Sequence, residues 1–143
     1  MMQFIQPFEQ YFLLAGRILV GGFFVVAGIQ KFMGIDMVAG YIGSVGLPMG
    51  TALAWLAAIF LTVAGAMLIA GYYAYEAALL LAAYVLVVTV IFHGPQYWPT
   101  EQGMFMKNAA LLGGILAMAA HLRLVEKPER SPLMSASSPT LAM

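Results

Sequence analysis

Long apolar stretches separated by short polar links dominate the pattern of the chain. Each stretch holds about twenty mainly apolar residues, the length that an α-helix needs to cross the roughly 30 Å hydrocarbon core of a bilayer. The expected fold class is therefore all-α, an integral membrane four-helix bundle. The four predicted spans are Tyr11–Phe32, Pro48–Ile69, Tyr73–Phe92 and Gln102–Leu122.

Glycine and proline residues mark the ends of these stretches. Gly46-Leu47-Pro48 breaks the chain before the second span and places a proline where a helix can begin. Gly71 follows the second span and Gly94-Pro95 follows the third, and both are typical of helix C-termini. Pro99-Thr100-Glu101-Gln102 offers a cap and an acidic residue at the start of the fourth span.

Two regions follow from this pattern. Residues 1–127 form the expected four-span membrane domain. Residues 128–143 form a tail rich in serine and proline, a composition typical of disordered segments.

Composition supports a membrane protein and excludes several other classes. The chain is 63% apolar and only 8% charged, whereas soluble domains carry about 25% charged residues. Basic and acidic residues are equal in number, so no basic surface predicts nucleic-acid binding. The chain contains no cysteine, which excludes disulfides, thiolate metal sites and thiol redox chemistry.

The distribution of basic residues predicts the orientation in the membrane. Lysine and arginine are enriched in cytoplasmic segments. We therefore expect both termini in the cytoplasm, residues 33–49 and 94–103 on the outside, and the protein in the inner (plasma) membrane. Four basic residues lie toward the end that holds the termini (Arg17, Arg123, Lys127 and Arg130), and two lie at the opposite end (Lys31 and Lys107).

Arg17 and Lys31 lie fourteen residues apart in the first span, close to four helical turns. They therefore share one face of the helix with Gly21, Phe24 and Gly28. A face with two cations and two glycines is expected to point into the bundle or toward a partner, because charges facing lipid are costly. The alternative is that both side chains extend to the membrane interfaces.

Glu76 is the predicted partner of Arg17 in an intramembrane ion pair. It lies near the start of the third span, on the same side of the membrane as Arg17 in this topology. The alternative is an exposed acid that stabilises the N-terminus of its own helix.

A second polar cluster is predicted at the outer ends of the spans. In an up-and-down bundle the first and third helices end, and the fourth begins, on the same side. Two lysines and an imidazole there would suit a quinone carbonyl or an oxyanion. Alternatively, Asp36 and Glu101 satisfy the lysines as a structural clasp, and His93 caps its own helix. The predicted ligand-binding residues are Lys31, His93, Lys107 and Asn108.

Small residues recur every four positions on the third and fourth spans. Such stripes let helix backbones approach closely in lipid, either within the chain or against a partner. The stripes are Ala74, Ala78 and Ala82 on the third span, and Ala109, Gly113 and Ala117 on the fourth.

No metal site and no catalytic residue is predicted. Several methionines lie at the outer end, and thioethers suit Cu(I), but methionines in so apolar a chain are more often packing residues. No phosphate-binding loop, nucleophile elbow or zinc-ligand spacing is present in the sequence.

Taken together, several short motifs resemble the DoxX family of small bacterial and archaeal membrane proteins. The resemblance runs from about Ala15 to Ala120, most of the chain. The motifs are Gly16-Arg17, Ala27-Gly28-Ile29-Gln30-Lys31-Phe32, Gly46-Leu47-Pro48, Phe92-His93 and Phe105-Met106-Lys107-Asn108-Ala109-Ala110-Leu111-Leu112.

This resemblance implies a four-helix membrane bundle. It also implies a link to quinone-coupled sulfur redox chemistry, because the family takes its name from a thiosulfate:quinone oxidoreductase. The sequence departs from the family pattern at one place. Members often carry a glutamate within the second helix, where Thr62-Val63-Ala64-Gly65 stands here.

The leading hypothesis is a small subunit of a redox-linked membrane assembly that binds quinone or lipid between its helices. No intrinsic cofactor is expected, and quinone is the candidate ligand cofactor. The expected partners are the lipid bilayer and other membrane protein subunits, without nucleic acid. Two alternatives remain, a non-catalytic structural or assembly subunit and a small-anion carrier that uses Arg17 and Lys31.

Overall fold

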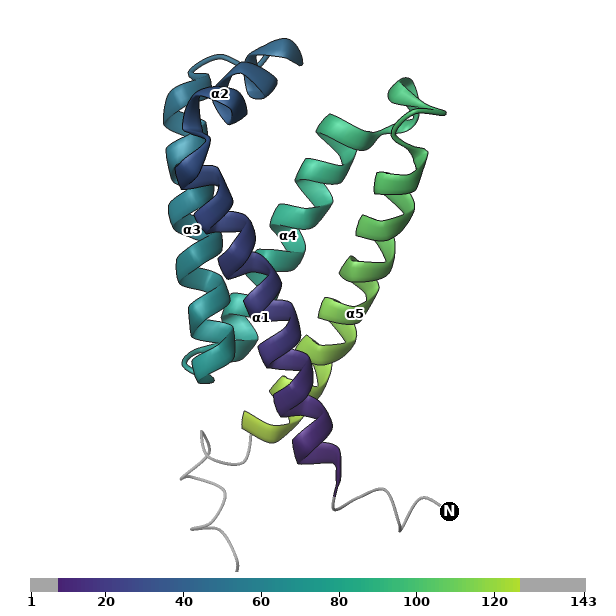
Figure 1. Ribbon diagram of the computed structural model, residues 1–143. Coiled ribbons are helices and arrows are strands. Elements are labelled where there is room, and N and C mark those ends of the chain that lie inside the picture. The colour runs from purple at the N-terminus through teal and green to yellow at the C-terminus, as the bar shows by residue number, and fades with distance from the viewer. Residues whose placement is uncertain (1–7, 127–143) are drawn as a thin grey trace, which may run out of the picture.

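The computed structural model describes residues 8–126, so the predicted tail at residues 128–143 lies outside the described part. This part is helical and contains no strand. Four helices are long and apolar enough to cross a membrane, and each coincides with a predicted span, which confirms the all-α fold class. The elements are α1 (Glu9–Met33), α2 (Ile35–Ser44), α3 (Gly50–Ala70), α4 (Ala74–His93), a short 3-10 helix (Pro95–Tyr97) and α5 (Gln102–Glu126) (Figure 1).

Helix α2 lies between the first two predicted spans, in a segment where the apolar pattern predicts no helix. It is ten residues long, too short to span a bilayer, and no side chain caps its N-terminus. Gly34 separates it from α1, and the Gly34 N–H donates to the Lys31 carbonyl at 3.2 Å. Ile42 is the buried residue of α2 and α3 is its main neighbour, so tertiary packing holds this short helix.

The predicted stop at Gly71 is confirmed, and its geometry explains the tight link between α3 and α4. Gly71 adopts φ of 77°, a conformation that favours glycine. Its N–H donates to the Leu68 carbonyl at 3.4 Å, and the Tyr72 N–H donates to the Met67 carbonyl at 3.0 Å. These two bonds form a Schellman motif, which ends α3 and reverses the chain into α4.

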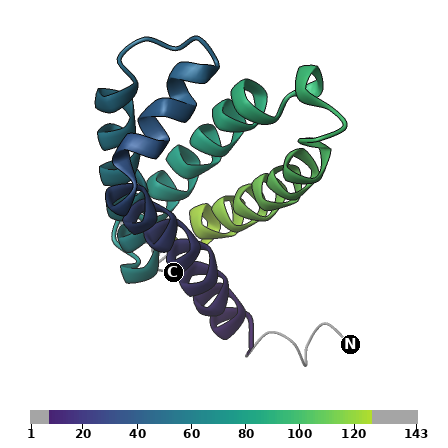
Figure 2. The same cartoon turned by 45° about the horizontal axis from the view of Figure 1, so that its top comes forward.

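The spanning helices form two antiparallel pairs. Helix α1 packs along α3, and α4 packs along α5. Helix α2 packs against α3 near Gly50, where α3 begins. Helices α3 and α4 connect the pairs, whereas α1 and α5 contact each other only slightly. The pairs diverge toward the end that carries α2 (Figures 1 and 2). The bundle is therefore open between its two halves.

Glycines bring the backbones of α1 and α3 into contact. A Cβ atom added at Gly21 would lie 2.7 Å from the Gly65 carbonyl oxygen, and one added at Gly28 would lie 2.8 Å from the Thr62 amide nitrogen. Such close approach is how helices associate in lipid, where apolar side chains gain little by leaving their surroundings. Gly21 and Gly28, with Phe24, are the buried residues of α1, which confirms that this face points into the bundle.

The small-residue stripes differ between α4 and α5. On α4 the stripe of Ala74, Ala78 and Ala82 is buried in the core. On α5 the stripe of Ala109, Gly113 and Ala117 is exposed, because that helix buries Ile115, Ala119 and Leu122 instead. The largest fully buried side chains of the described residues are Leu61, Leu68, Leu81 and Ile115.

Candidate functional site

The opening between the helix pairs contains a cavity of about 440 Å³, called here the α2 cleft. Residues of α1, α2 and α3 form one wall, and residues of α4 form the other. Its lining is predominantly apolar, with few polar groups, the usual character of a small-molecule site. The apolar residues are Val38, Ile42, Leu47, Leu53, Ala57, Val87, Val88, Ile91 and Phe92, and the polar ones are Lys31, Tyr41, Tyr84 and His93.

Lys31 lies in the last turn of α1 and is half-buried. A cation is favourable there because the C-terminus of a helix carries partial negative charge. Within residues 8–126 its ammonium group makes no hydrogen bond or ion pair with another side chain. Lys31 therefore provides donors to the cleft that no neighbouring side chain uses.

His93 is held in place by Glu101. Its Nδ1 lies 2.7 Å from Glu101 Oε2, and only 12% of the His93 side chain is exposed. An ionised carboxylate can only accept hydrogen bonds, so Nδ1 carries the proton and donates it. In the neutral imidazole this leaves Nε2 as a hydrogen-bond acceptor. The pair also joins the end of α4 to the residue that precedes α5.

Two tyrosines add hydroxyl groups to the cleft. Tyr84 lies within α4, and its ring packs against Phe60 with centroids 5.7 Å apart. Tyr41, on α2, stacks on Phe92 with centroids 5.1 Å apart. Burial raises the pKa of Tyr41, and the negative charge of Glu101 and the neighbouring Tyr97 raise it further. Tyr41 is therefore a protonated hydrogen-bond donor at neutral pH.

The structure brings Lys31 and His93 to the same cleft, but Lys107 and Asn108 do not line it. Lys107 is exposed and Asn108 is half-buried on α5. Equal depth in the bundle was the reason to expect all four together. Depth was insufficient because α5 packs mainly on α4 and makes no substantial contact with α2 or α3. The ligand-binding role of these residues remains a prediction.

Arg17 is engaged by the backbone of α3. Its Nε donates to the Leu68 carbonyl and its Nη2 to the Ile69 carbonyl, both at 2.9 Å. The guanidinium lies against Gly71, where a Cβ atom would overlap it. Arg17 thus donates to two of the last carbonyls of α3, and the Leu68 carbonyl also accepts the Gly71 N–H. Glu76 is half-buried in the first turn of α4, and the Arg17–Glu76 pair remains a prediction.

Sequence reasoning missed both tyrosines of the cleft. Tyr84 had a usable signal, because it is a hydroxyl-bearing side chain in the middle of an apolar span. Tyr41 had none, because its segment was expected to be a loop. Within the described residues, no group of three or more histidine, aspartate or glutamate side chains could hold a metal ion.

Comparison with known proteins identifies the family. The DoxX family model matches residues 12–94. This segment is more than half of the chain and includes every residue that lines the α2 cleft. Comparisons with curated proteins and with solved structures gave no match. With four apolar spanning helices and a match over most of them, this multi-pass membrane protein belongs to the DoxX family.

Proposed function

We propose that this protein is a small subunit of a redox-linked membrane assembly and binds a quinone in the α2 cleft. The observation that carries the proposal is the Lys31 ammonium, which faces an apolar cleft without a partner among the described side chains. A quinone has two carbonyl acceptors on an apolar ring. Its head therefore matches a cleft with few donors and many apolar side chains.

The dimensions and polar groups of the cleft fit this ligand class. A volume of about 440 Å³ lies within the range of small-molecule sites, roughly 300–1,000 Å³. Lys31 would donate to one carbonyl, and the hydroxyl of Tyr84 or Tyr41 would donate to the other. When bound, a quinone supplies two-electron, two-proton redox chemistry. The apolar wall of α4 would exclude water from the ring.

The His93–Glu101 pair would handle protons at this site. Nε2 of His93 is the nitrogen that Glu101 does not hold, so it can accept a proton from the cleft. The Glu101 carboxylate would then stabilise the imidazolium, because the two groups are already 2.7 Å apart. The electrons released with these protons would pass to a partner subunit.

An exposed helix face supports the presence of such a partner. Ala109, Gly113 and Ala117 form an outward stripe on α5, and a Cβ atom at Gly113 would meet nothing within 4 Å. Small residues on a lipid-facing helix favour close docking of another helix. This observation equally favours the second candidate, a structural or assembly subunit without a quinone. We place the assembly in the inner membrane.

A small-anion carrier has less support. That function would use Arg17 and Lys31 together as the binding charges. Arg17 donates to the Leu68 and Ile69 carbonyls, and it is not among the residues that line the α2 cleft. An anion in the cleft would therefore meet Lys31 without Arg17.

Quinone binding by a Lys31→Met variant tests the proposal. Methionine keeps an unbranched apolar side chain that is one heavy atom shorter, and it removes the charged donor. Losing one charge-assisted hydrogen bond costs about 1.5–3 kcal/mol, so the Kd for a short-chain ubiquinone or menaquinone should rise roughly tenfold or more. Titration of the purified protein, followed by the fluorescence of Trp55 and Trp98, measures the change.

Lys107→Met is the matched control, because Lys107 is exposed and does not line the cleft. The Lys107→Met variant should bind quinone with the same affinity as the unmodified protein. Equal affinities for all three proteins would contradict a quinone in the α2 cleft. Absence of any quinone binding, with the protein recovered in an otherwise complete complex, would favour the assembly subunit.

A further inference from the structure

A second cavity lies on another side of the bundle, between α1 and α5 near the described ends of the chain. It has a volume of about 490 Å³ and is called here the α1–α5 groove. It shares no lining residue with the α2 cleft. It exists because α1 and α5 contact each other only slightly.

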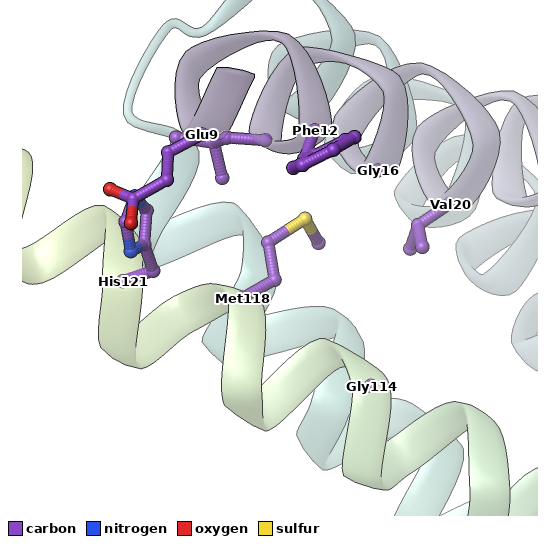
Figure 3. A pocket seen from close by; sticks show the side chains of 8 residues that line it. Glu9, Phe12, Gly16, Val20, Gly114, Met118 and His121 are labelled. Carbon is purple, nitrogen blue, oxygen red and sulfur yellow. The ribbon is translucent and has the colours of Figure 1, made fainter. Parts of the chain in front are cut away.

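The groove has a polar end and an apolar end. Glu9 and His121 line the polar end, and Val20 and Gly114 line the other, with Phe12, Gly16 and Met118 between them (Figure 3). The groove therefore runs along the helices rather than across them. Val20 lies eleven positions after Glu9, about 16 Å along α1. An apolar groove of this length, open at a polar end, has the shape of an acyl-chain site.

The polar end lies where lipid headgroups would be. Glu9 is in the first turn of α1, beside the exposed aromatic residues Tyr11 and Phe12. Aromatic side chains of this kind are enriched at membrane interfaces. His121 lies near the end of α5 and is half-buried. The groove thus begins at the interface and enters the hydrocarbon region.

The charges at this end select the headgroup. Within residues 8–126, no ion pair or hydrogen bond joins Glu9 to a basic side chain. Arg17 donates to α3, and Arg123 donates to the Tyr75 hydroxyl at 3.2 Å. A carboxylate that no hydrogen bond or ion pair joins to a basic side chain favours a cationic donor, and the imidazole at the same end can donate to a phosphate oxygen. An ammonium and a phosphate on one ligand would satisfy both groups.

We propose that the α1–α5 groove binds one phospholipid with a primary-amine headgroup, phosphatidylethanolamine, in the leaflet that holds the described chain ends. Glu9 accepts from the ammonium, His121 donates to the phosphate, and one acyl chain lies along Gly16 and Gly114. Phosphatidylcholine has no N–H to donate, and phosphatidylglycerol would place an uncharged glycerol beside Glu9. This site is separate from the α2 cleft and does not depend on quinone binding.

Lipid retention measured by native mass spectrometry tests the proposal. The full chain is purified in mild detergent and mixed with equal amounts of dioleoyl phosphatidylethanolamine, phosphatidylcholine and phosphatidylglycerol. The unmodified protein should retain one phosphatidylethanolamine about tenfold more than either competitor, the preference expected for one charge-assisted hydrogen bond. Glu9→Gln should abolish that preference while leaving the helical content unchanged. Equal retention of the three lipids, or a preference for phosphatidylglycerol, would overturn the proposal.

Two neighbouring glycines give a matched pair of variants for the acyl chain. A Cβ atom at Gly114 or at Gly113 meets nothing within 4 Å, but only Gly114 lines the groove. Gly114→Leu should fill the groove and lower phosphatidylethanolamine retention about tenfold, whereas Gly113→Leu should leave it unchanged. Equal retention by the two variants would overturn the acyl-chain site. Displacement of the lipid by a second copy of the chain, detected as a dimer, would also overturn it.

Discussion

At the scale of single residues, the two cations of α1 show how one helix face separates a structural role from a binding role. Arg17 donates to two carbonyls of α3 and lies against Gly71. Lys31, fourteen positions later on the same face, lines the α2 cleft without a side-chain partner among the described residues. The planar guanidinium can donate to two carbonyls in a fixed geometry, which an ammonium cannot. Arg17 therefore stabilises the fold, and Lys31 remains available to a ligand.

Replacement of Arg17 tests its structural role. Arg17→Leu removes the side-chain donor of the Ile69 carbonyl and one of the two donors of the Leu68 carbonyl. An unsatisfied group in a low-dielectric setting costs about 1–3 kcal/mol. We expect a marked drop in the unfolding temperature in detergent. Arg123→Leu is the control, because Arg123 is exposed and bonds only a tyrosine hydroxyl within the described residues. Equal unfolding temperatures of the two variants would contradict this role.

The predicted Arg17–Glu76 pair calls for a separate measurement. If the two side chains interact, replacing both with neutral residues should lower the stability by less than the sum of the losses from the two single replacements. Additive effects in a double-mutant cycle of detergent stability would show that the interaction of Arg17 with the α3 carbonyls accounts for its whole contribution.

At this scale the sequence predicted which residues are unusual better than it predicted their neighbours. Arg17, Lys31 and His93 stood out because polar groups are costly in lipid. The partners of Arg17 and His93 did not, because one contact depends on backbone carbonyls of α3 and the other on the link before α5. Glu101 pairs with His93 only because the link around Pro95–Tyr97 returns the chain to the end of α4.

At the scale of helices, the glycine contacts between α1 and α3 decide how closely these elements pack. Gly21 and Gly65 are mutual neighbours, since a Cβ atom at either would lie 2.7 Å from the carbonyl oxygen of the other. Backbone atoms cannot yield as a flexible side chain can. A single methyl group there must separate the helices.

Adjacent glycines on α1 provide the test of this contact. Gly21→Ala should lower stability by about 1–3 kcal/mol, the usual cost of overpacking, because its Cβ would overlap the α3 backbone. Gly22→Ala should be neutral or stabilising, because nothing lies within 4 Å of its added Cβ and alanine favours helix. Denaturant titration of both variants followed by circular dichroism measures the difference. A larger loss for Gly22→Ala would contradict the close approach of α1 and α3.

The four spanning helices could be predicted because length and hydropathy are sufficient evidence for a membrane span. Helix α2 could not. Ile35–Ser44 contains Gly40 and Gly43 and lacks a side-chain cap, so its local signal is weak. Its packing on α3 is a tertiary effect that a pattern along the chain does not contain. Because α2 provides Val38, Tyr41 and Ile42, the missed helix also hid part of the α2 cleft.

At the scale of the whole molecule, the two cavities are consequences of one arrangement. The α1–α3 and α4–α5 pairs diverge toward α2, and this divergence opens the α2 cleft. At the other end α1 and α5 contact each other only slightly, and the α1–α5 groove lies between them. A closed four-helix bundle would have neither. The expectation that Lys107 and Asn108 would join Lys31 assumed such a closed bundle. The sequence thus predicted the four spanning helices, while the separation of the pairs determined which residues meet.

The orientation of the molecule decides which side of the membrane each cavity faces. Among the described residues, Arg17 and Arg123 lie toward one end, and Lys31 and Lys107 lie toward the other. The excess at the first end comes from Lys127 and Arg130, which follow α5 in the sequence. Positive charges are retained in the cytoplasm, so we expect the chain ends there and α2 on the outside.

A reporter active only outside the cytoplasm should give signal when fused at Gly43, which is exposed on α2, and none at Met143. A reporter active only in the cytoplasm should give the reverse. Replacing Lys127 and Arg130 with glutamine should weaken the bias and produce mixed signals, whereas Lys107→Gln should strengthen it. Cytoplasmic signal at Gly43 in the unmodified chain would invert the topology, and the α2 cleft would then face the cytoplasm.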